Sequence, residues 1–171
     1  MLFQNENLLA IMILYMDGMD SILFLIRLKE MFKISKSMIS KIKFKDYNFT
    51  DDKLKFLSLL PEIEYLDLSQ SDDITNLGLK EIRSLKQLKY LDIRNCTKIT
   101  ERGIWNLGPC SELRYLSIGY FHMKEVGLWA ISNFTNLTTL IINDINMFSF
   151  KSKLIREWID NLSNLELFRN K

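Results

Sequence analysis

The chain has 171 residues and a mass of 20.3 kDa, which suffices for one domain or two small ones and excludes a large multidomain enzyme. Hydrophobic residues make up 47% of the chain and charged residues 26%, with only 6 Gly and 2 Pro, so the composition excludes a disordered or fibrous protein. The formal net charge is +2, which argues against nucleic acid or an anionic membrane as an obligatory partner.

Two short apolar helices are the first predicted elements. Residues 8–16 form an apolar run that ends at Asp17, and a second run covers residues 22–26. Each run is shorter than the ~20 apolar residues that a membrane-spanning helix needs. A signal peptide would carry a basic residue before its apolar run, but no Lys or Arg precedes the first run here. We therefore expect no membrane contact and an intracellular location, in the cytoplasm or nucleus.

Helices that are apolar on almost every side carry more apolar surface than a small domain can cover. Two interpretations remain open: these helices pack onto the rest of the chain, or they dock a partner protein. Seven apolar side chains would make either contact: Leu8, Leu9, Met12, Ile13, Met16, Ile22 and Phe24.

An internal repeat occupies the chain after residue 34. The segment 63–68 (IEYLDL) recurs as 88–93 (LKYLDI) and as 113–118 (LRYLSI), each 25 residues after the last. The same frame predicts further units that start near 39 and 137, and a partial strand at 165–168. Apolar residues at the first, fourth and sixth positions are typical of a strand with one buried face.

A helix is predicted after each strand. Thr50, Thr75 and Thr100 are placed to cap free backbone N–H groups at the start of these helices. Apolar residues at helical spacing follow: Leu54, Leu57, Leu60, Leu79, Ile82, Leu85, Ile104, Leu107, Leu128, Ile131 and Phe134. Each unit is therefore expected to contain a strand, a turn and a helix, and stacked units are expected to share one core.

This frame resembles the leucine-rich repeats, in particular their cysteine-containing subtype. The match is carried by residues 95–104 (NCTKITERGI) with Cys110, and neighbouring units retain residues 74–79 (ITNLGL) and 126–128 (VGL). The resemblance implies an α/β fold: residues 34–171 form a short right-handed solenoid with a parallel concave sheet, convex helices and a C-terminal cap. It also implies a ligand-binding module rather than an enzyme.

The helical segment 1–33 is similar to an F-box. Its apolar residues run into Met16-Asp17-Gly18-Met19-Asp20 and a second apolar helix, although Gln4-Asn5 replaces the usual Leu-Pro opening. This resemblance implies that the seven apolar residues dock the Skp adaptor of a cullin-based ubiquitin ligase, while the repeats hold the protein targeted for degradation. The alternative is an interaction scaffold unrelated to ubiquitin, in which the same helices cap the solenoid.

No pattern of catalytic or metal-binding residues occurs in the sequence. His122 is the only histidine, and Cys96 and Cys110 lie at repeat positions that are typical of buried structural residues. The sequence has neither a glycine-rich phosphate loop nor a nucleophile elbow. We therefore expect no enzymatic activity, no cofactor and no metal.

The third, fifth and seventh positions of each unit are expected to face outward and to form rows across neighbouring strands. The row at the third position reads Lys41, Tyr65, Tyr90, Tyr115 and Thr139. Tyrosines in the open are typical of protein-binding surfaces, although they also favour strand formation by themselves. The residues expected to bind a protein target are Lys41, Lys43, Tyr65, Asp67, Tyr90, Asp92, Arg94, Tyr115 and Tyr120.

Overall fold

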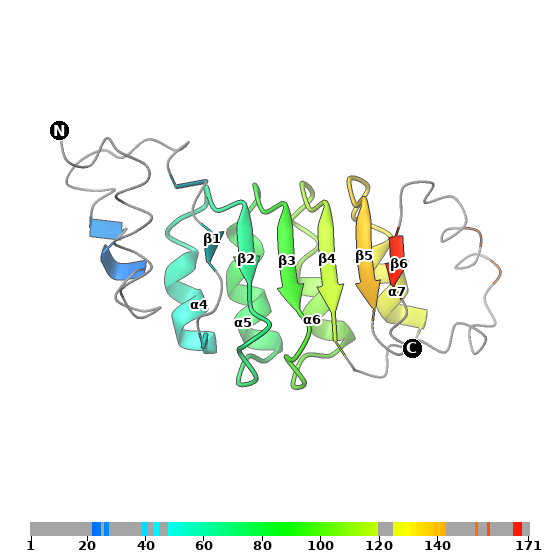
Figure 1. Cartoon of the computed structure of the whole chain (residues 1–171), viewed down its shortest axis with the longest axis horizontal. Coiled ribbons are helices and arrows are strands. Elements are labelled where there is room, and N and C mark those ends of the chain that lie inside the picture. Colours follow the sequence, from blue (N-terminus) through cyan, green and yellow to red (C-terminus); the bar gives the residue numbers. More distant parts are fainter. Residues whose placement is uncertain are drawn as a thin grey trace.

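The part of the chain that the structure describes is a mixed α/β fold with a six-stranded parallel sheet (Figure 1). The computed structural model describes residues 22–24, 26–27, 39–40, 43–44, 48–119, 125–142, 153, 157 and 166–168. The strands pair in chain order and are β1 (Lys43–Phe44), β2 (Tyr65–Asp67), β3 (Tyr90–Ile93), β4 (Tyr115–Ile118), β5 (Thr139–Ile142) and β6 (Glu166–Phe168).

A layer of helices lies on one side of the sheet, behind the strands in Figure 1. The helices are α4 (Asp51–Leu57), α5 (Asn76–Glu81), α6 (Glu101–Asn106) and α7 (Glu125–Ile131), and a 3-10 turn η2 (Ile82–Ser84) extends α5. Each helix contacts the next one along the chain, as each strand does. The described part of the chain therefore consists of consecutive strand–helix units placed side by side.

The core lies between the strands and the helices. Leu66, Leu91 and Leu116, at the fourth position of three units, are fully buried. All eleven apolar residues that the helical spacing predicts to face inward are buried as well. The alternation in the strands and the spacing in the helices therefore predicted the core correctly.

Polar side chains at the helix starts join each unit to the next. The Thr50 and Thr75 side chains accept hydrogen bonds from Lys53 N and Leu77 N, which confirms both as N-caps. The Thr75 hydroxyl in turn donates to Asp51 Oδ2 at 2.6 Å, and its backbone N–H donates to Asp51 Oδ1 at 2.9 Å.

The next junction repeats this contact with an amide in place of the carboxylate. Thr100 N–H donates to Asn76 Oδ1, and Asn76 Nδ2 donates to Thr100 Oγ1, both at 2.9 Å. Thr100 makes no side-chain bond to its own helix. Its hydroxyl therefore serves the contact between units rather than a cap.

The four strands β2 to β5 pair in the predicted register, but β1 and β6 do not. Tyr65 lies opposite Tyr90, and Tyr90 lies opposite Tyr115. At the first strand, Lys43 rather than Lys41 lies opposite Tyr65, so the predicted frame there is wrong by two residues. At the last strand, Glu166 lies opposite Thr139, which shifts the predicted frame by one residue. The outer units have different lengths, and a constant period cannot place them.

Candidate functional site

Three tyrosines stack across the face of the sheet opposite the helices. The rings of Tyr65 and Tyr90 are 4.0 Å apart between centroids and 10° from parallel, and those of Tyr90 and Tyr115 are 4.2 Å apart and 9° from parallel. All three residues are half-buried. Neighbouring strands lie ~4.8 Å apart, so tyrosines in register bring their rings to stacking distance. We call Tyr65, Tyr90 and Tyr115 the tyrosine ladder.

The central phenol of the ladder stays protonated over a wide pH range. The pKa of Tyr90 lies far above its ordinary value of 10.0, first because of burial and then because of side-chain hydrogen bonding with Tyr65 and Tyr115. The central ring of the ladder therefore stays neutral, with a hydroxyl group at its end.

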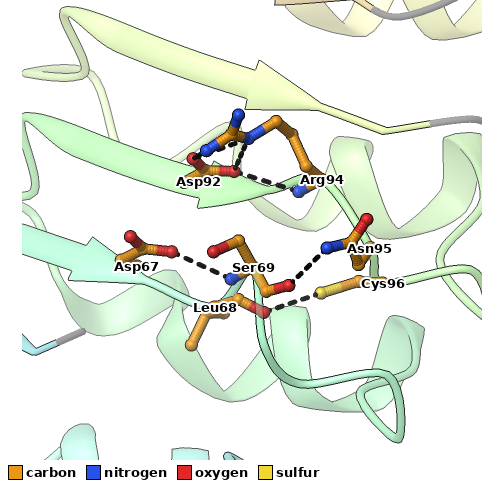
Figure 2. Close-up of polar contacts among 7 residues, drawn as sticks. All are labelled: Asp67, Leu68, Ser69, Asp92, Arg94, Asn95 and Cys96. Atoms are coloured by element: carbon orange, nitrogen blue, oxygen red, sulfur yellow. Dashed lines mark hydrogen bonds and ion pairs between the residues drawn. The ribbon is translucent and has the colours of Figure 1, made fainter. Parts of the chain in front are cut away.

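An ion pair lies next to the ladder on β3 (Figure 2). Arg94 Nε donates to Asp92 Oδ1 at 3.1 Å and to Oδ2 at 2.9 Å, and its Nη2 lies 2.8 Å from Oδ2. The Arg94 backbone N–H also donates to Asp92 Oδ1, at 3.1 Å. The hydrogen bond to Asp92 is the main reason that the pKa of Arg94 is raised. This carboxylate therefore fixes both the backbone and the guanidinium of Arg94.

Asp92 lies on the same face as the ladder, as the alternation predicts, but it is not exposed as a binding residue. Its side chain is 0% exposed, whereas that of Arg94 is 45% exposed. Arg94 lies over the carboxylate and covers it, so the pair presents a cation to solvent. Ser117, which pairs with Asp92 in the sheet, is also fully buried. The outward-facing row at the fifth position is therefore interrupted at β3 and β4.

Asp67 repeats only part of this arrangement. Its Oδ1 accepts a hydrogen bond from Ser69 N at 2.9 Å, as Asp92 Oδ1 does from Arg94 N. The seventh position holds Ser69 here, so no cation among the described side chains covers the carboxylate, and Asp67 stays half-buried. Among the described side chains of the face, β2 therefore presents a carboxylate and β3 presents a cation.

The two cysteines are buried at turns between units, as predicted. The Cys96 thiol donates to Leu68 O at 3.3 Å (Figure 2), and the Cys110 thiol donates to Ile82 O at 3.8 Å. Burial raises the pKa of Cys96 to about 12 and that of Cys110 to about 11. Neither thiol is activated as a nucleophile, because each stays protonated at neutral pH.

The other predicted binding residues fall into three groups. Lys41, Tyr120, Leu8, Leu9, Met12, Ile13 and Met16 lie outside the described residues. Lys43 is described only through its backbone, which pairs with Tyr65. Ile22 is 0% exposed within the hydrophobic core, and Phe24 is partly buried against it. Of the seven N-terminal apolar residues, the two that are described therefore contact the chain itself.

The helices carry an exposed apolar surface that was not predicted from the sequence. Trp105 of α6 and Trp129 of α7 are 48% and 53% exposed, and Val126 of α7 is 56% exposed. Trp105 and Trp129 occupy the same position of adjacent helices, 24 residues apart. Extending the row comparison from the strands to the helices would have found them.

In the part of the chain that the structure describes, no group of three or more His, Cys, Asp or Glu residues is placed to hold a metal ion. No described helix has the length and apolar character needed to cross a bilayer. A scan against protein-family models gives no match, and a search of curated proteins finds no significant relative.

Proposed function

We propose that the chain is a protein-binding module, built as a short solenoid of the leucine-rich-repeat type, whose tyrosine ladder contacts the partner. Sequential parallel pairing, helices on one side and repeated contacts between helix starts all support the solenoid. The observation that carries the binding role is the ladder itself: three stacked, half-buried tyrosines in register on consecutive strands.

A sheet does not require tyrosine at these positions. Thr139 fills the next place in the row on β5, which shows that a small β-branched residue fits there. Tyrosine adds a large, rigid contact surface with a polar end and few rotatable bonds, and these properties make it frequent at the centres of protein interfaces. The ladder therefore adds contact surface that the fold can do without.

Site-specific photo-crosslinking in cells of the source organism tests this function. A benzophenone amino acid at Tyr90 is expected to give a discrete crosslinked protein, because the partner covers the ladder. The same group at Lys80, an exposed residue on α5 behind the sheet, is the matched control. Absence of a discrete adduct at Tyr90, or the same adducts at both positions, would contradict the proposal.

A role as substrate adaptor of a cullin-based ubiquitin ligase is the second candidate. It is favoured by Leu23, which is 37% exposed in the same helical stretch as Ile22 and leaves apolar surface for an adaptor. In this role the F-box-like segment 1–33 binds a Skp adaptor, the tyrosine ladder binds the target, and the protein acts in the cytoplasm or nucleus. Burial of Ile22 in the core favours the first candidate, in which this segment caps the solenoid.

Size-exclusion chromatography and titration calorimetry with a purified eukaryotic Skp adaptor separate the two candidates. Micromolar or tighter binding that is lost in a folded Leu9→Asp, Ile13→Asp variant would establish the adaptor role. A monodisperse, folded chain that does not bind would leave the scaffold role.

A further inference from the structure

The stacking of the three rings determines which parts of each tyrosine are exposed to a partner. Both faces of the Tyr90 ring are covered, one by Tyr65 and the other by Tyr115. The outward parts of the ladder are therefore ring edges and hydroxyl groups. The edge of an aromatic ring carries partial positive charge, and a phenol hydroxyl donates a hydrogen bond. Both features favour a partner group that is negatively charged or accepts hydrogen bonds.

Arg94 adds a fixed cation to this surface. Asp92 engages Nε and Nη2, and Nη1 makes no hydrogen bond or ion pair with any described residue. Figure 2 shows the guanidinium lying over the Asp92 carboxylate with one nitrogen pointing away from it. Because Asp92 already holds the fork in place, a second carboxylate can bind its free edge at little cost in side-chain entropy.

The sheet geometry places this cation beside the ladder. Asp92 follows Tyr90 by two residues on β3, so both side chains lie on the same face, and Arg94 folds back over Asp92. Tyr115 lies opposite Tyr90 on β4, and its ring stacks on that of Tyr90. The cation and two of the three tyrosines therefore form one surface.

The neighbouring charges leave this end of the face positive. Lys89 is neutralised by Glu64, whose Oε2 lies 2.7 Å from the lysine Nζ. Arg114 occupies the same second position of the next unit, outside the outward rows, and it is exposed and has no ion pair in the described ranges. The nearest uncovered carboxylate described on the face is that of Asp67, at the β2 end. An acidic group would therefore bind toward β3 and β4 and avoid β2.

We propose that the protein partner presents an acidic peptide segment to this surface. One of its carboxylates binds the free edge of Arg94 and the hydroxyl groups of Tyr90 and Tyr115. Asp92 is the positioning residue, because it orients the guanidinium without touching the peptide. This inference rests on the proposed binding function and adds the chemistry of the partner.

Titration of the full chain with hexaglutamate, followed by ¹H–¹⁵N NMR of the Arg94 Nε–H signal, tests the inference. We expect a saturable shift that weakens at least threefold when the salt concentration rises from 50 to 300 mM, because screening reduces contacts between exposed charges. Hexalysine is the matched probe and is expected to leave the Arg94 signal in place.

Two variants identify the residues responsible. The double variant Asp92→Asn, Arg94→Gln removes both charges together, so no unpaired charge stays buried, and should weaken hexaglutamate binding tenfold or more. Asp67→Asn removes the acidic group at the other end and should bind as tightly as the wild type or more tightly. Circular dichroism establishes that both variants are folded.

Three results would overturn the inference: no shift with hexaglutamate, an equal shift with hexalysine, or unchanged affinity in the double variant. A discrete crosslink at Tyr90 together with any of these would show that the binding function stands and that the partner is not acidic. Loss of the crosslink as well would remove both proposals.

Discussion

Two buried serines differ in their hydrogen bonding and allow the energetics of the repeat to be measured. Ser71 and Ser117 are both 0% exposed. Ser71 Oγ accepts a hydrogen bond from Phe49 N at 2.8 Å, across 22 residues, whereas Ser117 Oγ is buried without a partner among the described residues. A buried polar atom without a hydrogen-bond partner lowers the free energy of unfolding. A substitution that removes the partner of a buried polar atom has the same effect.

We predict that Ser71→Ala lowers the free energy of unfolding by about 1–3 kcal/mol, because Phe49 N would lose its acceptor. Ser117→Ala should leave it unchanged or raise it by up to about 1 kcal/mol, because an unpaired hydroxyl is removed. Urea denaturation followed by circular dichroism measures both values. Equal losses in the two variants would show that Ser117 has a partner after all.

The buried thiols predict a loss of stability at alkaline pH. Folding raises the pKa of Cys96 to about 12 and that of Cys110 to about 11, from an ordinary value of 9.0. Above pH 9 the unfolded chain therefore loses these protons while the folded chain retains them, so the stability that is complete below pH 9 decreases as the pH rises.

The expected decrease is about 1 kcal/mol per thiol between pH 8 and pH 10. Denaturation curves at several pH values measure it. The Cys96→Ala, Cys110→Ala variant is the control and should show a smaller slope over this interval. The same slope in both proteins would refute the role of the thiols.

At the scale of the elements, two glycines make room for the contacts between helix starts. A Cβ added at Gly103 would lie 2.5 Å from Asn76 Oδ1 and 3.0 Å from Ile99 Cγ2. A Cβ added at Gly78 would collide with Asp51 Oδ1 in the equivalent contact one unit earlier. Each glycine thus allows the side chain of the preceding helix to reach the following threonine.

We therefore predict that Gly103→Ala lowers the free energy of unfolding by about 1–3 kcal/mol, as overpacking does. At an exposed position inside a helix, Gly→Ala raises the free energy of unfolding by about 1 kcal/mol, so the effect expected at Gly103 has the opposite sign. Gly108→Ala is the control, because its Cβ would come no closer than 3.4 Å to Trp105 O.

A second substitution isolates the contact responsible. The double variant Asn76→Ala, Gly103→Ala lacks the Asn76 oxygen with which the new Cβ would collide. Its loss of unfolding free energy should therefore be smaller than the sum of the losses in the two single variants. Strict additivity in this cycle would show that Gly103 is needed for another reason.

The elements that the sequence predicts best are those in which the spacing of apolar residues indicates which side chains are buried. Leu66, Leu91 and Leu116 recur in one frame, and each is buried as expected. The burial of Asp92 was not predictable, because strand alternation indicates only the direction of a side chain. Whether Arg94 then folds over that side chain depends on its rotamer. The frames of β1 and β6 failed because terminal units depart in length from the central ones.

At the scale of the whole molecule, the two faces of the described structure differ in chemistry. The face of the sheet carries the tyrosine ladder and a fixed cation, whereas the helix layer carries the exposed rings of Trp105 and Trp129. A partner on one face leaves the other free. The crosslinking groups at Tyr90 and Lys80 therefore report on separate surfaces.

The part that the N-terminal segment plays in the whole fold can be measured with two adjacent residues. Ile22 is 0% exposed within the same hydrophobic core as Leu54 and Leu66, whereas Leu23 is 37% exposed. We predict that Ile22→Ala lowers the free energy of unfolding of the whole chain by about 2–5 kcal/mol, as expected for a truncated core side chain. Leu23→Ala should cost less than about 1 kcal/mol.

Urea denaturation of the full chain, followed by circular dichroism, measures both values. If Ile22→Ala lowered the free energy of unfolding as little as Leu23→Ala is expected to, the segment containing Ile22 would not be part of the folding unit. If Ile22 is required, the segment serves first as a cap on the repeats. An adaptor could then bind only through side chains such as Leu23 that the cap leaves exposed, so Leu23→Asp should abolish Skp binding without unfolding the repeats.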